Sequence, residues 1–177
     1  MSIAELVVLV DDDGNPVGSA PKVSVHGAET PLHLAFSCYL RGADGQILLT
    51  RRALSKQAWA GVWTNSFCGH PAPGEAYVDA IRRRGRQELN VEVQDIEVVL
   101  ADFRYRATDP GGVVEHEICP VFTARIVGDP VPESSEVVEW NWVTPDALIQ
   151  SVEHTPFIYS PWLKEQLPLL LSANALA

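Results

Sequence analysis

Residues 69–91 read GHPAPGEAYVDAIRRRGRQELNV, and this stretch decides the fold. It opens with a loop that holds two prolines and then continues from Glu75 to Leu89 without another. Apolar side chains recur in that segment at helical spacing, at Ala76, Ala80, Ile81 and Leu89. The spacing predicts an amphipathic helix over 75–89 whose apolar face packs on a core.

Segments with the character of β-strands lie on both sides of this helix in the chain. They span 5–10, 33–40, 46–50 and 62–68 before it, and 96–106, 113–126 and 137–143 after it. The turn signals ADG at 43–45 and TDPGG at 108–112 predict hairpins. Thr144-Pro145 and Ser160-Pro161 each join a capping hydroxyl to a proline, which is typical of a helix start. The order of elements predicts an α+β fold, with a mixed sheet flanked by helices.

Length and composition indicate a single domain over residues 1–177, with the segment after about Leu163 peripheral. The chain has 177 residues and a formal net charge of −10, which argues against a general role in nucleic-acid binding. Its three cysteines, at 38, 68 and 119, do not fit a disulfide scaffold. No apolar run reaches the length of a membrane span. We therefore expect a cytoplasmic protein that binds neither nucleic acid nor membrane.

A metal site is the first chemical hypothesis. In the strand predicted over 113–126, Glu115 and Glu117 are two residues apart and share a face. Two carboxylates on one face repel each other unless a cation or a proton offsets them. With the imidazoles of His26, His33 and His70, they make a donor set that suits Mg²⁺, Mn²⁺ or Zn²⁺. Taken singly, each of these residues also fits a loop, a strand edge or a solvated strand face.

The cysteine at position 68 differs from the other two. Cys38 and Cys119 stand inside apolar segments, as buried cysteines do. Cys68 ends a predicted strand and precedes Gly69 and His70, and the loops after strands carry chemistry more often than strand centres. A hydrolytic Cys-His pair is an alternative, although the sequence shows no third residue to orient it.

Basic residues cluster in two places of this acidic chain. They are Arg51, Arg52 and Lys56 in one group, and Arg82, Arg83, Arg84 and Arg86 in the other. The second group is either a solvated helix face or, with the first, a site that binds a diphosphate through bidentate and point-charge contacts.

Residues 69–91 resemble the Nudix signature G-x5-E-x7-R-E-U-x-E-E-x-G-U, in which U is apolar. The matching residues are Gly69, Glu75, Arg83, Glu88 and Val91. Arg84 and Gln87 replace two glutamates, Gly85 replaces an apolar residue, and Asn90 replaces a glycine. Nudix hydrolases use those glutamates to hold the metals that activate water. The resemblance therefore implies a Nudix-like fold that has lost hydrolysis.

A second resemblance covers most of the chain, from about Val7 to Trp162. The segments LHLAFS (32–37), TRRALSKQAWAGVWTNSFCGHP (50–71), DFRYRATDP (102–110), GVVEHEICPVF (112–122) and FIYSPW (157–162) are similar to the type 1 isopentenyl-diphosphate Δ-isomerases, a Nudix-fold family. This implies a mixed sheet between helices, with an extra N-terminal strand or hairpin and a C-terminal helix. It also implies an isomerase of isoprenoid biosynthesis, which interconverts isopentenyl and dimethylallyl diphosphate by metal-assisted protonation and deprotonation.

The same resemblance implies roles for the residues at matched positions. One divalent metal (Mg²⁺, Mn²⁺ or Zn²⁺) would be held by His26, His33, His70, Glu115 and Glu117. The catalytic residues would be Cys68 and Glu117, with Tyr105 as partner of the glutamate and Trp162 facing the carbocation. Glu88 would hold a second Mg²⁺ that arrives with the substrate. The diphosphate would contact Lys22, Arg52, Lys56 and Arg84.

Two other functions compete with the isomerase. A Nudix hydrolase acting on a nucleoside diphosphate derivative would need the glutamates that are missing at positions 84 and 87. A metal-stabilised binding module would have no need for Cys68, Glu117, Tyr105 and Trp162 together. We therefore expect an enzyme that acts on a small molecule, as a monomer or a weak homodimer.

Overall fold

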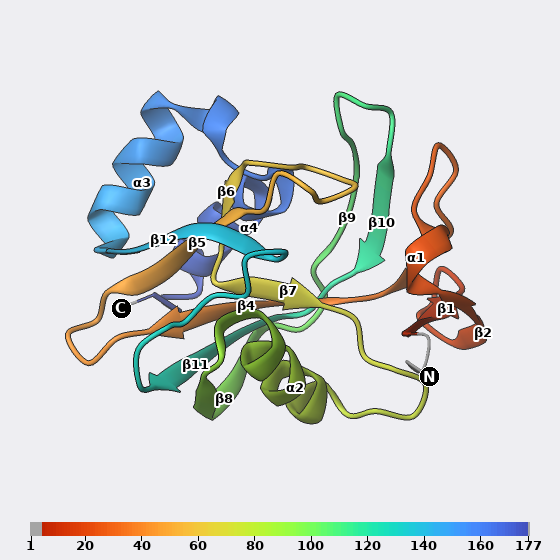
Figure 1. The fold of residues 1–177 in the computed structure, drawn as a ribbon, viewed down its shortest axis with the longest axis horizontal. Coiled ribbons are helices and arrows are strands. Elements are labelled where there is room, and N and C mark those ends of the chain that lie inside the picture. The colour runs from red at the N-terminus through yellow and green to blue at the C-terminus, as the bar shows by residue number, and fades with distance from the viewer. Residues whose placement is uncertain (1–4, 177) are drawn as a thin grey trace.

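The computed structural model describes residues 5–176, and its strands form two sheets (Figure 1). The strands are β1 Leu6–Val10, β2 Pro16–Pro21, β3 His33–Leu34, β4 Phe36–Arg41, β5 Ile47–Arg52, β6 Trp63–Thr64, β7 Phe67–Gly69, β8 Glu92–Leu100, β9 Arg104–Thr108, β10 Val114–Ile118, β11 Val121–Val127 and β12 Val137–Val143. The helices are α1 Lys22–Val25, α2 Tyr77–Leu89, α3 Pro145–His154, α4 Pro161–Ser172 and the 3-10 helix η1 Pro156–Ile158.

The two sheets are mixed, which confirms the expected α+β fold. The five-stranded sheet has the order β2-β1-β3-β10-β9. The seven-stranded sheet has the order β12-β5-β4-β11-β8, with β6 paired to β5 and β7 paired to β4. In each sheet one pair of strands is parallel, β3 with β10 and β4 with β11.

Within residues 5–176, three connections pass from one sheet to the other and join them: β3 to β4, β10 to β11 and β8 to β9. β3 continues into β4 after Ala35, and β10 continues into β11 after Cys119 and Pro120. The strand expected over 113–126 is therefore two strands in different sheets, because Pro120 has no N–H for a ladder and the chain bends there. The strand expected over 96–106 likewise divides into β8 and β9, which belong to different sheets.

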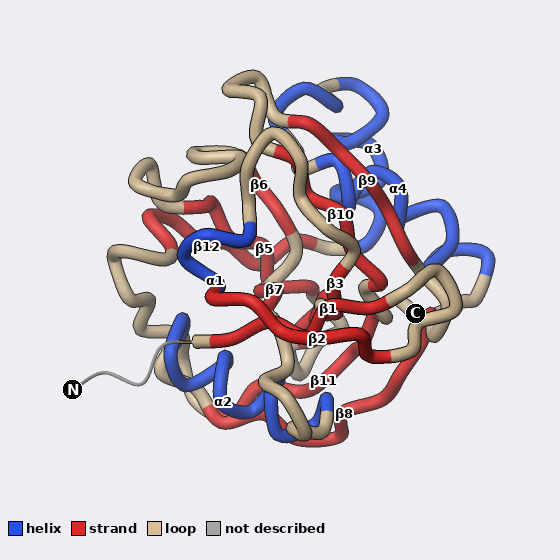
Figure 2. The backbone as a smooth tube through the Cα atoms, turned by 90° about the vertical axis from the view of Figure 1, so that its right-hand side faces the viewer, coloured by secondary structure: helices blue, strands red, loops and turns tan. Residues whose placement is uncertain are grey.

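Helices cover both faces of the seven-stranded sheet (Figure 2). Along β4 the side chains alternate between two cores. Cys38 packs with Ile81 and Leu89 in the core on the α2 side, whereas Tyr39 packs with Leu163 in the core on the α4 side. This is the arrangement of a sheet between helices that the sequence predicts.

Helix α2 ends where the signature would place its glycine. Asn90 follows the helix in the left-handed conformation, with a φ of 53°. Asparagine adopts that conformation more readily than most residues do. Its Nδ2 donates a 2.7 Å hydrogen bond to the carbonyl oxygen of Val131. The departure from the signature at position 90 thus keeps the same helix end.

The C-terminal helix α4 packs in the core, and not at the periphery that we expected after Leu163. Leu163, Leu167 and Leu170 are buried, and Gln166 is a hydrogen-bond partner of Tyr39. The reason is that these leucines recur at helical spacing and form an apolar face, which needs a partner surface. No helix within residues 5–176 is long and apolar enough to cross a membrane.

Candidate active site

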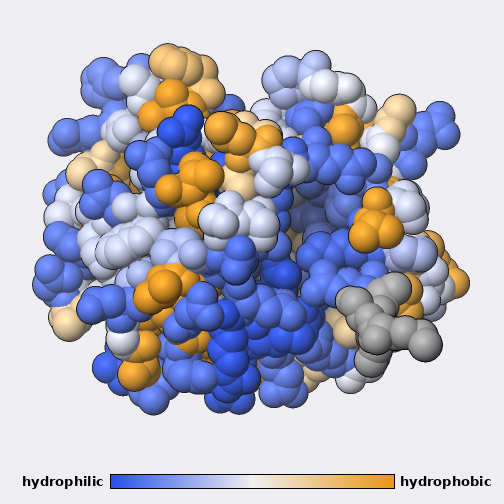
Figure 3. Space-filling model, viewed as in Figure 1, coloured by the Kyte–Doolittle hydropathy of each residue, from blue (hydrophilic) through white to orange (hydrophobic). Residues whose placement is uncertain are grey.

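Residues from both sheets line a pocket of about 350 Å³. Figure 3 shows hydrophilic residues around a hollow on this face of the molecule. The site residues implied by the sequence all line the pocket, apart from His33, which is fully buried. The structure therefore brings together residues that span most of the chain.

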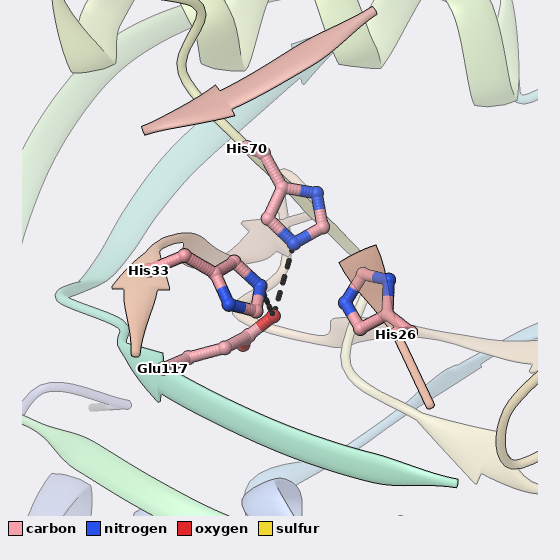
Figure 4. Close-up of side chains that lie close together, drawn as sticks. All are labelled: His26, His33, His70 and Glu117. Atoms are coloured by element: carbon pink, nitrogen blue, oxygen red, sulfur yellow. Dashed lines mark hydrogen bonds and ion pairs between the residues drawn. The ribbon is translucent and has the colours of Figure 1, made fainter. Parts of the chain in front are cut away.

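Three histidines and one glutamate converge on one point of the site (Figure 4). His26 follows α1, His33 is in β3, His70 follows β7 and Glu117 is in β10. Each offers one ligand atom, and these atoms all lie within 4.8 Å of one another. Such a group of nitrogen and oxygen donors has the size and chemistry of a divalent-metal site.

The hydrogen bonds of His33 test whether this group fits a metal. Nδ1 of His33 lies 2.9 Å from the carbonyl oxygen of Pro31, and a carbonyl only accepts. Nδ1 therefore donates the proton, and Nε2 has its lone pair free unless a second proton binds there. Nε2 lies 3.4 Å from Oε1 of Glu117. A lone pair facing a carboxylate is unfavourable unless a positive charge lies between them. Burial lowers the pKa of His33, but Glu117 raises it overall, so a second proton can supply this charge. A metal ion bound to both atoms supplies it equally, so the group fits a metal.

Burial and the contacts within this group together set its charges. Burial lowers the pKa of His70 to about 4, which leaves a neutral imidazole near pH 7. Burial alone would raise the pKa of Glu117, but the neighbouring His33 and His70 hold that pKa well below its ordinary value. A neutral imidazole and an ionised carboxylate are the forms in which these groups bind metals.

Glu115 lies beside this group without being part of it. It shares the face of β10 with Glu117, as the period of two predicts. Its Oε2 is 3.1 Å from Nε2 of His26. Glu115 is buried, so it can be a further ligand of the same metal or a partner that orients His26.

Cys68 lines the same pocket and is held by two polar neighbours. Its sulfur lies 3.3 Å from Oδ1 of Asn65, to which the thiol donates, and 3.4 Å from Oγ of Ser37. Burial raises the pKa of Cys68 to about 12, so the thiol keeps its proton. Nε2 of His70 lies 3.0 Å from Glu117 instead. These contacts suit a proton carrier better than the thiolate of a hydrolytic Cys-His pair.

Two aromatic side chains complete this part of the wall. Tyr105 stands directly opposite Glu117 in the ladder of β9 and β10, so both point to the same side. The ring centroids of Tyr105 and Trp162 are 5.8 Å apart. Nε1 of Trp162 donates a 3.0 Å hydrogen bond to Oδ1 of Asn65. The guanidinium of Arg52 lies 5.4 Å from the Trp162 ring centroid, a distance at which an indole ring attracts a cation.

Positive charge gathers on another part of the pocket, the cationic wall, which consists of Lys22, Arg52, Lys56 and Arg84. Arg84 is buried and pairs with Glu88 one turn along α2. Lys56 and Arg84 both pair with Glu136. Two backbone carbonyls, those of residues 58 and 59, accept hydrogen bonds from Arg52.

The other arginines of the two sequence clusters do not line the pocket. They form ion pairs elsewhere: Arg51 with Glu139, Arg82 with Asp79, Arg83 with Glu75 and Arg86 with Glu92. Consecutive residues of a helix point in different directions, so a run of arginines brings only part of its charge to one face. Only Arg84 of the α2 cluster lines the pocket.

Sequence reasoning missed the polar residues that support Cys68. Asn65 and Ser37 contact its sulfur, and Nε2 of Gln166 donates a 2.9 Å hydrogen bond to Oγ of Ser37. Asn65 lies in the segment WTNSFCGHP, three residues before Cys68, and this closeness in the sequence could have identified it as a partner of the thiol. Ser37 and Gln166 are 129 residues apart, and no local pattern links them.

Comparison with known families and structures identifies the fold. The NUDIX domain family matches residues 31–165. A crystal structure from Deinococcus radiodurans has a TM-score of 0.72 at 22% identity, over 93% of this chain and 98% of that one. That of a MutT protein from Methanosarcina mazei has a TM-score of 0.64 at 20% identity, over 82% of this chain and 97% of that one. These likenesses confirm a Nudix fold.

Relatives named isopentenyl-diphosphate Delta-isomerase match nearly the whole chain. That of Paenarthrobacter aurescens is 57% identical over 99% of this chain and 96% of its own length. That of Clavibacter michiganensis is 59% identical over 97% and 88%. That of Corynebacterium glutamicum is 55% identical over 92% and 89%. The chain therefore belongs to the NUDIX domain family and, within that fold, to the isopentenyl-diphosphate Delta-isomerase family.

Proposed function

We propose that this protein is an enzyme of isoprenoid biosynthesis that interconverts isopentenyl diphosphate and dimethylallyl diphosphate. The observation that carries the proposal is a single pocket that combines a thiol, a buried carboxylate and the cationic wall. A thiol and a carboxylate supply proton transfer, and the cationic wall suits a diphosphate. Membership of the isomerase family specifies the five-carbon substrate.

The reaction moves a carbon–carbon double bond and needs two proton transfers. The terminal alkene carbon gains a proton, and the π electrons form the new C–H bond, which leaves a tertiary carbocation-like species. A proton then leaves the neighbouring carbon on the other side of the cation, and its C–H electrons form the new double bond. Atoms and electrons balance without a redox partner. The enzyme must therefore supply a proton donor and a proton acceptor on opposite faces of the substrate.

We assign these two roles to Cys68 and Glu117. Burial keeps the Cys68 thiol protonated, and the histidines keep the Glu117 carboxylate ionised. One group thus holds a proton while the other can accept one. Because the reaction is reversible, each group donates in one direction and accepts in the other.

The group of His26, His33, His70 and Glu117 is able to hold a metal ion, and we propose Glu115 as a further ligand. When bound, Mg²⁺, Mn²⁺ or Zn²⁺ would supply positive charge that sets the proton affinity of a ligating carboxylate. Of the chain's own residues, Tyr105 is buried, and this burial, with the nearby Glu117, raises its pKa well above the ordinary value. Its phenol therefore stays protonated, and we propose that it donates a hydrogen bond to Glu117.

Trp162 is proposed to stabilise the carbocation. An indole face attracts positive charge and offers no nucleophile that would trap the cation. The ring is buried, and its hydrogen bond to Asn65 fixes its orientation. A buried ring also helps to keep water away from the reacting carbons.

For the diphosphate we propose contacts from the cationic wall and a second Mg²⁺ held by Glu88. Arginine and lysine bind phosphate oxygens through charge-assisted hydrogen bonds. Arg84 and Glu88 are paired neighbours on α2, so the phosphate contact and the proposed metal ligand lie side by side. In this proposal α2 binds the substrate, whereas the signature helix of Nudix hydrolases holds the metals for hydrolysis.

The Nudix hydrolase alternative has less support. Arg84 and Gln87 stand where that signature has glutamates. Oε1 of Gln87 accepts a 3.2 Å hydrogen bond from Nη1 of Arg84, and Gln87 is exposed and does not line the pocket. A binding module would account for the metal group and would leave the thiol without a use.

We further propose a single-domain cytoplasmic enzyme over residues 1–177 that works as a monomer or a weak homodimer. Its partner is the small-molecule substrate, without nucleic acid or membrane. The net charge of −10 supports the absence of nucleic-acid binding, because the phosphate backbone repels an acidic protein.

Product analysis with purified, metal-loaded protein tests the proposed function. From isopentenyl diphosphate we expect dimethylallyl diphosphate, without release of inorganic phosphate. Phosphate released from a nucleoside diphosphate derivative, with no isomerisation, would support the hydrolase instead. An unchanged five-carbon diphosphate would support the binding module.

A further inference from the structure

Glu136 places a carboxylate of the protein among the residues of the cationic wall. Its backbone is held on both sides, since its N–H donates to the carbonyl of Glu133 and its carbonyl accepts from the N–H of Ala53, each at 2.9 Å. Its side chain lines the pocket and pairs with Lys56 and Arg84. Oε2 of Glu136 is 3.3 Å from Nη2 of Arg84. The protein thus already supplies an anion to two of the proposed phosphate contacts.

This carboxylate is ionised at neutral pH. Burial alone would raise the pKa of Glu136, but Arg84 and Lys56 hold that pKa below its ordinary value. The side chain is 21% exposed, so water screens its two ion pairs only in part. Glu136 therefore acts on the pocket as a fixed negative charge.

The charges on this part of the pocket nearly cancel before a ligand binds. Against the four basic side chains of the cationic wall stand the carboxylates of Glu5, Glu88 and Glu136. The surplus is one positive charge. One phosphate monoester carries about −1.5 to −2 at pH 7, and a diphosphate carries more. A free diphosphate would leave this region with excess negative charge.

We infer that Glu136 is a specificity-determining residue, which makes the site select the divalent-cation complex of a diphosphate over the free diphosphate. The inference rests on the proposed function, which supplies a diphosphate as the ligand. Glu136 competes with a free diphosphate for Lys56 and Arg84, because two anions that share the same donors repel each other. A divalent cation that accompanies the diphosphate offsets this repulsion, so Glu136 disfavours the free form more than the complex.

Calorimetric binding of inorganic pyrophosphate tests the inference. The protein is loaded with one equivalent of Zn²⁺ for the histidine group and titrated with and without Mg²⁺. Glu136→Gln removes the charge and keeps the size of the side chain. In this variant we expect the affinity without Mg²⁺ to rise about tenfold, which equals about 1.4 kcal/mol. The gain in affinity that Mg²⁺ produces should shrink by the same factor.

Glu139→Gln is the matched control. Glu139 lies three residues along the chain from Glu136, in β12, and pairs with Arg51 at 2.7 Å, but it does not line the pocket. Its substitution should leave both affinities unchanged. Glu136→Ala removes the same charge in a different way and should reproduce the effect of Glu136→Gln.

Three results would overturn the inference. Unchanged or weaker binding without Mg²⁺ in Glu136→Gln would mean that Glu136 orients Lys56 and Arg84 and does not compete. A lost Mg²⁺ effect without a gain in Mg²⁺-free affinity would mean that Glu136 is only a metal ligand. Absence of pyrophosphate binding by the unsubstituted protein under both conditions would mean that this is not a diphosphate site.

The readout separates this inference from the proposed function, because pyrophosphate binding requires no isomerisation. If the affinities change as expected while isopentenyl diphosphate stays unreacted, the inference stands and the proposed function fails. If isomerisation occurs while Glu136→Gln changes neither affinity, the proposed function stands and the inference fails.

Discussion

Among single residues, Asn65 organises the wall of the pocket. Its Nδ2 donates to the carbonyl oxygens of Cys38 and Phe67, at 2.9 and 2.8 Å, which fixes the direction of the amide. Its Oδ1 then accepts from the Cys68 thiol and from Nε1 of Trp162. One buried oxygen thus holds the thiol and the indole in a fixed relation, as proton transfer to a positioned alkene requires.

Replacing Cys68 by alanine should lower kcat by at least about 100-fold, because a positioned general acid or base contributes about 10²–10⁴-fold. Pyrophosphate affinity should stay unchanged, since the thiol is not one of the proposed diphosphate contacts. Steady-state kinetics and calorimetry measure the two effects. Cys119→Ala is the control, because that sulfur also lies 3.4 Å from Oγ of Ser37 but does not line the pocket. Turnover of Cys68→Ala near that of Cys119→Ala would contradict the assignment.

Glu117→Gln should affect both the metal and the chemistry. Glu117 is the one carboxylate in the group of four ligand atoms, so we expect metal affinity to fall by at least about tenfold. Turnover should stay low even at saturating metal, because an amide does not accept the proton. Glu115→Gln, which changes a residue outside that group, should regain turnover at saturating metal. Metal titrations with parallel rate measurements test this, and equal behaviour of the two variants would argue against separate roles.

At the scale of helices and strands, the sequence predicted the features that depend on neighbouring residues, such as the capped starts of helices. Oγ1 of Thr144 accepts from the N–H of Ala147 at 3.2 Å, and Oγ of Ser160 accepts from the N–H of Leu163, so α3 and α4 begin where their caps predict. The division of 113–126 between two sheets was not predicted. The apolar alternation runs on through Pro120, and the choice of sheet depends on partners far away in the chain.

A pH-dependent ion pair joins the loop before α2 to the helix itself. Arg83 donates hydrogen bonds of 2.8 and 2.7 Å to the Glu75 carboxylate, and these lower the pKa of Glu75 from an ordinary value of 4.5. The stabilisation is therefore complete well above pH 4.5 and is lost as the pH falls through the lower, folded-state pKa. Glu75→Gln should reduce the free energy of unfolding by about 1 kcal/mol at neutral pH and by less as the pH falls.

Urea unfolding of Glu75→Gln between acidic and neutral pH measures this effect. Glu92→Gln is the control, since Glu92 accepts two hydrogen bonds from Arg86 but both side chains are exposed. Its substitution should change the free energy of unfolding less at neutral pH. If Glu75→Gln lowers the free energy of unfolding by the same amount at acidic and at neutral pH, the ion pair is not the cause of the loss.

In the molecule as a whole, the site depends on contacts between distant segments. The Tyr39 hydroxyl donates a 2.8 Å hydrogen bond to Oε1 of Gln166, whose Nε2 donates to Ser37 beside Cys68. Family resemblance pointed to many of the residues that line the pocket, most of which lie in specific motifs. It missed Gln166 and Glu136, because their contacts join segments that carry no local signal for one another. It also missed the burial of α4, although the helical spacing of Leu163, Leu167 and Leu170 was a local signal of an apolar face.

Leu170→Ala tests whether α4 is part of the core. Leu170 is fully buried, so the cavity should reduce the free energy of unfolding by about 2–5 kcal/mol. Leu169→Ala is the neighbouring control, because Leu169 is 46% exposed and its loss should cost less than about 0.5 kcal/mol. Chemical denaturation of both variants measures the difference. Equal and small effects of the two substitutions would indicate that α4 is peripheral and is not part of the core.

The central claim is isomerisation by proton exchange, and proton NMR of isopentenyl diphosphate with the metal-loaded protein in D₂O tests it most directly. The account predicts that dimethylallyl diphosphate forms and carries deuterium, because the proton added to the alkene comes from a group that exchanges with solvent. An unchanged spectrum, with the metal confirmed in the protein and pyrophosphate binding intact, would contradict it.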